Sequence, residues 1–303
     1  MGVEERDKYT GHMTTGHEWN GIKELNTRVP RVIWITLSLA FVFAIICWIL
    51  YPAWPLGVTY TKGLLETNQH IRVDKDVERA IDSRAVWTDK IISLDYGQIQ
   101  DDPNLMKIVR ETGQTLFLDN CAACHGRTAN GGPGFPSLRD KAWLWGGTPE
   151  AISETIRVGI NASNDDTRMS QMLAFGHDQM LTRNQIDDVI NYVLSLNKSA
   201  AQHDVGEASI ASGKTVFLEN CASCHGENAE GSIEVGAPNL TDDHWIYGGT
   251  RQAIFTTVWK GRMGQMPSWQ GRLSAVDQKI LTLYLLDLGT SDAEKSKSGA
   301  SRN

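Results

Sequence analysis

Two short motifs in this chain of 303 residues place two cysteines and a histidine at the same spacing. They read Cys121-Ala-Ala-Cys124-His125 and Cys221-Ala-Ser-Cys224-His225. Cys-Xaa-Xaa-Cys-His is the pattern of c-type haem attachment. Its two thiols form thioethers with the vinyl groups of one porphyrin, and the histidine that follows binds the iron from one face. We therefore expect two covalently bound haem c groups, with His125 and His225 as iron ligands.

Three other uses of paired cysteines are weaker interpretations. A zinc site built from two such pairs usually has a shorter separation, and each pair here lies in its own complete repeat. A thioredoxin-like redox pair needs a βαβ context, which this sequence does not show. Local disulfides would not explain a histidine after both pairs. The fifth cysteine, Cys47, lies in an apolar run and is best interpreted as a small apolar residue.

The two motifs belong to a duplication. ETGQTLFLDNCAACHG (111–126) matches ASGKTVFLENCASCHG (211–226), and RMSQM (168–172) matches RMGQM (262–266). The first copy has eight extra residues around 160–167. Two copies are too few for a solenoid, so they indicate two tandem domains of one type.

Each copy opens and closes with a helical pattern, and its middle is rich in Gly, Pro and Trp with little strand alternation. Capping signals mark the starts of the closing helices: Thr182 with Gln185, and Ser274 with Asp277. The fold class that these patterns predict is all-α with long loops.

The iron of a small c-type cytochrome usually takes a methionine from a later loop as its sixth ligand. Both copies carry two aligned candidates, Met169 and Met172 in the first and Met263 and Met266 in the second. Pro267 stiffens the chain after Met266, which favours Met266 and its aligned partner Met172. We expect each copy to use its own methionine, while Met169 and Met263 remain open alternatives.

Bis-histidine ligation by His177 or His244 is the other alternative, although these two residues do not align with each other. The histidine of each motif needs its second ring nitrogen fixed, because that proton sets the tautomer and the ring orientation. A backbone carbonyl beside the matching residues Pro136 and Pro238 would serve.

Glycine and aromatic residues also recur at matching places. On the opening and closing helices they suggest a close helix crossing over the haem edge: Gly113, Phe117, Gly213, Phe217, Tyr192 and Tyr284. In the middle loops they are expected to pack round the porphyrins: Trp143, Trp145, Trp245 and Tyr247.

Val32 to Tyr51 is an uncharged apolar run that is long enough to span a hydrocarbon core of about 30 Å. It is too long for a cleaved signal peptide and lacks a small-residue cleavage site. Five Lys or Arg residues precede it, whereas only Lys62 and Arg72 follow it closely. The positive-inside bias therefore predicts a single-pass protein of the bacterial inner membrane, with a cytoplasmic N-terminus and periplasmic haem domains.

The predicted segments follow from these boundaries. They are a cytoplasmic segment (1–31), a transmembrane anchor (32–54), a periplasmic connector (55–104), the first haem domain (105–200), the second haem domain (206–290) and a disordered tail (291–303).

Composition excludes several classes of protein. A mean hydropathy of −0.30 excludes a polytopic membrane protein. The net charge of −7 argues against nucleic acid as a partner. Residues 1–57 are neutral, so this charge belongs to residues 58–303, where it would suit a basic electron donor.

The haem domains resemble class I cytochromes c, and the N-terminal segments narrow the resemblance. EWNGIKELNTRVPR (18–31), the apolar run and WILYPAWPLG (48–57), with two haem domains after them, resemble the dihaem CcoP/FixP subunits of cbb3-type cytochrome c oxidases. The resemblance implies haem attachment and iron ligation by these residues: Cys121, Cys124, His125, Met172, Cys221, Cys224, His225 and Met266.

The resemblance also implies a role and partners. Such a subunit takes electrons from a donor cytochrome c or the bc1 complex and passes them, through a monohaem cytochrome c subunit, to the haem–copper catalytic subunit that reduces oxygen. This chain has no candidate copper site, so it is expected to be the electron-input subunit of an oxidoreductase without catalytic residues of its own. A subunit of another periplasmic redox complex, or a free membrane-bound carrier, is the alternative.

Overall fold

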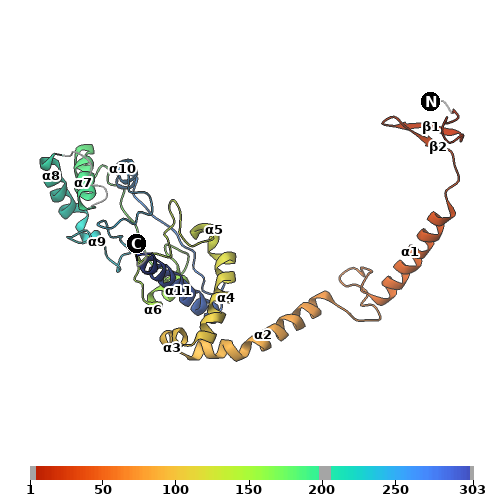
Figure 1. Ribbon diagram of the computed structural model, residues 1–303, viewed down its shortest axis with the longest axis horizontal. Helices are drawn as coiled ribbons and strands as arrows, with labels where there is room; N and C mark the ends of the chain where they lie inside the picture. Colours follow the sequence, from red (N-terminus) through yellow and green to blue (C-terminus); the bar gives the residue numbers. More distant parts are fainter. Residues whose placement is uncertain (1–4, 198–205, 301–303) are drawn as a thin grey trace. The chain divides into compact units, whose positions relative to one another are not determined.

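The computed structural model describes residues 5–197 and 206–300, which fall into two units, Met1–Arg84 and Ala85–Asn303. Parts of the predicted segments (1–4, 198–200 and 301–303) lie outside the described residues. Figure 1 shows the elements of both units, which are considered separately below.

The first unit begins with a β-hairpin that the sequence interpretation missed. Strands β1 (Thr14–Trp19) and β2 (Ile22–Leu25) pair antiparallel. Asn20 and Gly21 join them, both with positive φ (51° and 86°). Asn-Gly between two strands is the strongest short-range hairpin signal, because both residues tolerate the left-handed conformation of a type I′ turn.

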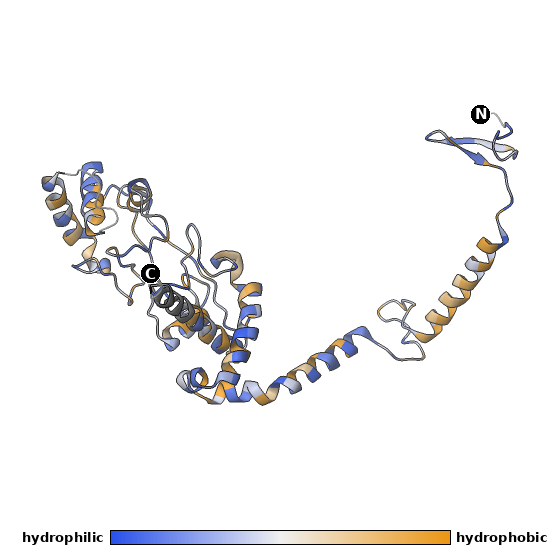
Figure 2. Cartoon of the chain, in the orientation of Figure 1, coloured by the Kyte–Doolittle hydropathy of each residue, from blue (hydrophilic) through white to orange (hydrophobic). Residues whose placement is uncertain are grey.

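Helix α1 (Arg31–Leu50) follows and has no buried residue. Among the described residues it is the one helix long and apolar enough to cross a membrane, and Figure 2 colours most of it as hydrophobic. The loop after it folds back, so that the amides of Leu64 and Leu65 donate to the carbonyls of Ile49 and Leu50. These bonds satisfy carbonyls that a helix end leaves without partners.

The second unit is helical. A long helix, α2 (Gln69–Ser93), leads into it from the first unit. Its further elements are α3 (Tyr96–Asp101), α4 (Pro103–Asn120), α5 (Ala122–His125), α6 (Pro149–Val158), α7 (Arg183–Leu196), α8 (Glu207–Asn220), α9 (Ala222–His225), α10 (Arg251–Lys260) and α11 (Ala275–Ala300).

Both predicted caps are present. Thr182 and Gln185 form a reciprocal capping box at the start of α7. The Ser274 hydroxyl accepts from the Asp277 amide at 3.2 Å, at the start of α11.

The opening and closing helices cross closely, but each helix crosses its counterpart from the other copy. Helix α4 packs against α11, and α7 packs against α8. A Cβ at Gly113 would lie 2.6 Å from Cβ of Tyr284, and a Cβ at Gly213 would overlap the Asp188 carbonyl and the Tyr192 side chain. The two copies therefore exchange their closing helices.

Two apolar cores result, and each contains parts of both copies. The first core is Phe117, Ala129, Ile152, Ile156, Trp269, Leu281 and Leu285. The second core is Phe175, Leu181, Ile186, Val189, Ile190, Tyr192, Val193, Leu194, Val216, Phe217, Ala229, Ile254 and Val258. The chain thus has two haem domains in tandem, but the compact cores do not coincide with the consecutive segments 105–200 and 206–290.

The end of the connector docks on the first core's helices. Ile91 and Ile99 are fully buried, in a cluster with Val109 of α4 and with Ile280 and Leu283 of α11. The connector therefore packs against the helices of the first core from Trp87 onward.

The predicted disordered tail differs from the structure over residues 291–300, which continue α11 to Ala300. These residues include Ala, Glu and Lys, which have good helix propensity, and lack proline. A helix that has already nucleated on the packed core extends through such residues without a new nucleation cost.

We expect Gly213→Ala to destabilise the second unit, because the new methyl group must displace the α7 backbone at the helix crossing. Overpacking of this kind costs about 1–3 kcal/mol. Thermal unfolding of the full chain in detergent, followed by far-UV circular dichroism, measures the loss. Gly132→Ala is the matched control, since a Cβ there meets nothing within 4 Å. Equal stability of the two variants would contradict the close crossing.

Candidate haem sites

Each motif begins where its opening helix ends. Helix α4 stops at Cys121, whose amide still bonds to the Phe117 carbonyl, and the short helix α5 carries the chain to His125. Helices α8 and α9 repeat this geometry through Cys221 to His225. The turn places two thiols and one imidazole side by side, as c-type attachment requires. None of these thiols forms a disulfide.

Each motif histidine is held by the backbone carbonyl that the sequence predicts. Nδ1 of His125 lies 3.0 Å from the Pro136 carbonyl oxygen, and Nδ1 of His225 lies 3.0 Å from that of Pro238. A carbonyl only accepts, so Nδ1 carries the proton and donates it. The lone pair of each Nε2 is then available to a metal.

Burial keeps both imidazoles neutral. Desolvation lowers the pKa of His125 and of His225, and the bond to the proline carbonyl offsets this only in part. Burial also raises the pKa of Cys121 and of Cys221 to about 11. Near neutral pH the sites therefore present neutral nitrogen donors and protonated thiols, which suit a neutral iron ligand and thioether formation.

The two preferred methionines are partly buried against the apolar cores, whereas their alternatives are exposed. Met266 and Cys121 both pack against the first core, and Met172 and Cys221 both pack against the second. Met169 and Met263 are 67% and 60% exposed. A thioether that binds iron must lie against the porphyrin, so burial favours Met172 and Met266.

The methionine loops are exchanged together with the closing helices. Met266 and Ile160 pair through two backbone hydrogen bonds of 2.9 Å, and Met172 and Arg262 pair through bonds of 2.8 and 3.0 Å. The expectation that each copy uses its own methionine therefore differs from the structure, in which Met266 lies with the first motif and Met172 with the second. Nothing in the sequence indicated this, because the duplication makes the two methionine segments equivalent and does not say which core each one joins.

A glycine makes each exchanged pairing possible. Gly159 ends α6 with φ +72°, and a Cβ there would lie 2.5 Å from the Met266 carbonyl oxygen. Gly261 ends α10 with φ +69°, and a Cβ there would lie 2.5 Å from the Met172 carbonyl oxygen. Only glycine combines this backbone conformation with so close an approach.

The two histidines of the bis-histidine alternative lie outside the cores. His177 is on the surface and pairs with its neighbour Asp178 at 2.8 Å. His244 is half-exposed and lies 3.3 Å from Asp140.

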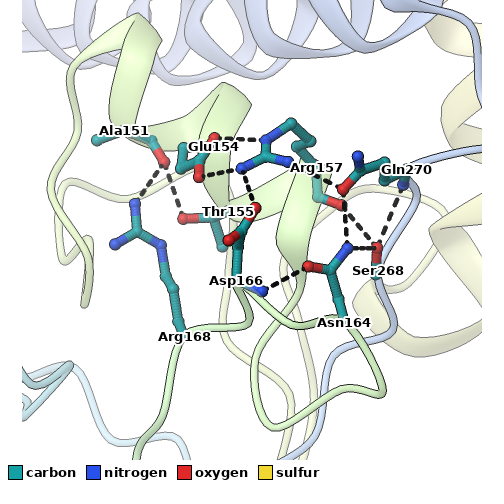
Figure 3. Close-up of polar contacts among 9 residues, drawn as sticks. All are labelled: Ala151, Glu154, Thr155, Arg157, Asn164, Asp166, Arg168, Ser268 and Gln270. Atoms are coloured by element: carbon teal, nitrogen blue, oxygen red, sulfur yellow. Dashed lines mark hydrogen bonds and ion pairs between the residues drawn. The ribbon is translucent and has the colours of Figure 1, made fainter.

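Sequence reasoning missed an arginine at each site. Arg168 stacks over Trp145 at 4.9 Å, and Arg262 stacks over Tyr247 at 4.2 Å. Their repetition in RMSQM and RMGQM was the available signal. Arg168 donates from Nη2 to the Ala151 carbonyl (Figure 3), but its buried Nε–H has no partner.

The unpaired Nε–H of Arg168 bears on whether the site fits a haem. A buried N–H without a partner is costly, and a haem carries two carboxylates that are strong acceptors. The first site thus has a partner for each part of a haem. Its apolar walls suit the porphyrin, Nε2 of His125 suits the iron, and the Arg168 guanidinium suits a propionate. Arg168 would hold a propionate there, and the bound iron would supply one-electron oxidation and reduction.

Comparison with known proteins supports two cytochrome c domains after a distinct N-terminal segment. Residues 11–58 match a family described as the N-terminal domain of cytochrome oxidase-cbb3, FixP. Residues 110–197 match cytochrome c, and residues 208–285 match cytochrome c oxidase, cbb3-type, subunit III.

Curated relatives are similar over nearly their full length. The chain is 42% identical to the cbb3-type cytochrome c oxidase subunit CcoP of Azospirillum sp. (strain B510), over 95% of this chain and 99% of the relative. It is 44% identical to the subunit FixP of Bradyrhizobium sp. (strain ORS 278), over 94% and 97%. This chain belongs to the CcoP/FixP family of cbb3-type cytochrome c oxidase subunits.

Membership establishes the general role. The chain is a membrane-anchored, electron-relay subunit of an oxidoreductase complex, and it works together with other oxidase subunits. Its two cytochrome c domains carry two covalently bound c-type haems. The resemblance drawn from the N-terminal segment and the two motifs is thereby confirmed.

We expect Arg168→Gln to lower the reduction potential of the haem at the first motif by some tens of millivolts. The substitution removes a positive charge and a buried donor from the propionate, so the more negative ferrous haem loses stabilisation. A tenfold change in a one-electron equilibrium corresponds to about 59 mV. Redox titration of the full chain measures both potentials, and an unchanged pair of values would contradict a propionate contact at Arg168.

Proposed function

We propose that this subunit passes electrons through two six-coordinate haems. A donor cytochrome c or a bc1 complex supplies the electrons, and a monohaem cytochrome c subunit carries them on to the haem–copper catalytic subunit. The observation that supports this most directly is the site geometry: each motif presents a neutral, fixed imidazole, and the other copy brings a partly buried methionine to the same core.

The proposed ligand set follows from that geometry. The thioethers form at Cys121, Cys124, Cys221 and Cys224. Met266 completes the site of His125, and Met172 completes the site of His225. Methionine–histidine ligation raises the reduction potential and leaves no open iron position. Such haems relay electrons and leave oxygen reduction to another subunit.

A cavity bordered by the loops that support both motif histidines supports direct transfer between the haems. Its volume is about 1040 Å³, and it lies between the loops that follow the two motifs. Its walls include Pro136 and Trp143 from the first copy and Pro238 and Trp245 from the second. The carbonyl supports of both histidines thus line one space, which favours a short path from one haem edge to the other.

The membrane orientation is proposed from charge. Five Lys or Arg residues precede the apolar run Val32–Tyr51, and few follow it closely. The positive-inside bias supports a cytoplasmic N-terminus and periplasmic haem domains in a bacterial inner membrane. The negative charge of residues 58–303 would then face a basic donor protein through a transient, charge-steered contact.

Purification of the complex through a tag on this chain tests the proposed partners. We expect the monohaem subunit and the haem–copper subunit to copurify, with copper and haem b in the preparation. A preparation that contains only this chain, with haem c as its one cofactor, would support a free carrier and contradict the proposal. Copurification with a dehydrogenase would support another redox complex.

The assignment of Met266 to the first motif and Met172 to the second predicts which reduction potential each substitution changes. Met266→His should strongly lower one haem potential, because it replaces methionine–histidine ligation by bis-histidine ligation. Adding Arg168→Gln should lower that same potential further, since both residues serve the first motif. Met172→His should lower the potential of the haem at the second motif, so adding Arg168→Gln should lower the potential of the other haem, at the first motif. Redox titration of the two double variants measures both potentials. The opposite pattern would support ligation of each iron by the methionine of its own copy.

A further inference from the structure

The eight residues that only the first copy has form a loop against the methionine loop of the second copy. Ile160 and Arg168 close the loop through a parallel bridge. From within it, Asn164 donates to the Ser268 hydroxyl at 3.1 Å and to the Gln270 side chain at 2.8 Å. Figure 3 shows these bonds beside Arg157, which also donates to Gln270, at 2.9 Å.

Asn161 has the most direct contacts with the methionine loops. Its Nδ2 donates to the carbonyl of Ser170, two residues before Met172, at 2.7 Å. The same nitrogen donates to the carbonyl of Gly264, two residues before Met266, also at 2.7 Å. Its Oδ1 accepts from the Ser170 amide at 3.1 Å. One side-chain amide therefore bonds to both loops.

The backbone of Asn161 adds a further bond and explains the residue type. Its carbonyl accepts from the side chain of Gln265 at 3.2 Å. Its φ is 48°, a left-handed conformation that asparagine tolerates better than most residues. Asparagine thus meets two demands at this position, a left-handed backbone and a side chain that both donates and accepts.

The second copy has no counterpart to this arrangement. There the chain runs from Gly261 directly into Arg262 and Met263, without the extra residues. The single amide of the first copy therefore bonds to both methionine loops, in addition to their backbone pairing. The loop of Met266 has additional support from Asn164, whose Nδ2 donates to Ser268 and Gln270 of the second copy while its Oδ1 accepts from the Asp166 amide of its own loop.

We propose that Asn161 is a positioning residue shared by both haem sites: its amide fixes the two loops that present Met172 and Met266 to iron. The proposal rests on the methionine ligation put forward above. Loss of the amide removes three hydrogen bonds at once, and both methionines become easier to displace.

The test uses the full-length haem-loaded chain in its purified complex. In ferric protein the methionine–iron bond gives a weak long-wavelength absorption band, which disappears as rising pH displaces the methionine. In Asn161→Ala we expect the midpoint of this loss to fall at both haems, with at least about a tenfold shift between methionine-bound and methionine-free forms. Both reduction potentials should fall as well.

Two further variants separate the amide from its surroundings. Asn161→Gly also removes the amide but relieves the left-handed backbone, so it should behave like Asn161→Ala. Asn164→Ala should affect only the haem of the first motif. If Asn161→Gly restores wild-type behaviour, or if only the melting temperature changes, the proposal is wrong.

Failure of the proposed ligation has a different signature. A wild-type chain without the methionine band at either haem would overturn the ligand assignment itself, and the positioning role with it. A wild-type chain with the band at both haems, together with unaltered Asn161 variants, would overturn only the role of Asn161.

Discussion

The haem sites depend on a reciprocal backbone contact between the two copies. Gly159 and Gly261 each end a helix at positive φ, and each lies so close to the methionine loop of the other copy that a Cβ would be 2.5 Å from a carbonyl oxygen of that loop. The residues that follow them pair with Met266 and Met172 through both backbone groups. Because an L-residue with a side chain fits neither position, this contact fixes where each methionine lies.

The other features of the second unit are consistent with that exchange. The closing helices follow the methionine loops into the opposite core, where Tyr284 and Tyr192 meet Gly113 and Gly213. Each core then needs both copies to be complete. A chain built in this way holds its two haems in one structure rather than in two separable domains, which suits an electron relay.

Much of the chemistry was predictable because it is local in sequence. The motifs, the capping boxes and the prolines beside the histidines have fixed spacings, and the apolar run needs only length and composition. The hairpin at Asn20 and Gly21 was predictable and was missed. The exchange was not predictable, because a duplicated sequence is equally compatible with pairing within or between copies. The roles of Arg168 and Asn161 depend on contacts between residues distant in sequence.

Cleavage between the two copies tests the exchange most directly. A protease site introduced within residues 198–205 of the full-length haem-loaded chain would yield two fragments, each with its own covalently attached haem. The account predicts that the fragments comigrate on size exclusion in detergent, and that separating them in denaturant abolishes the methionine–iron band of both. Fragments that separate under native conditions, each with its band intact, would contradict the account.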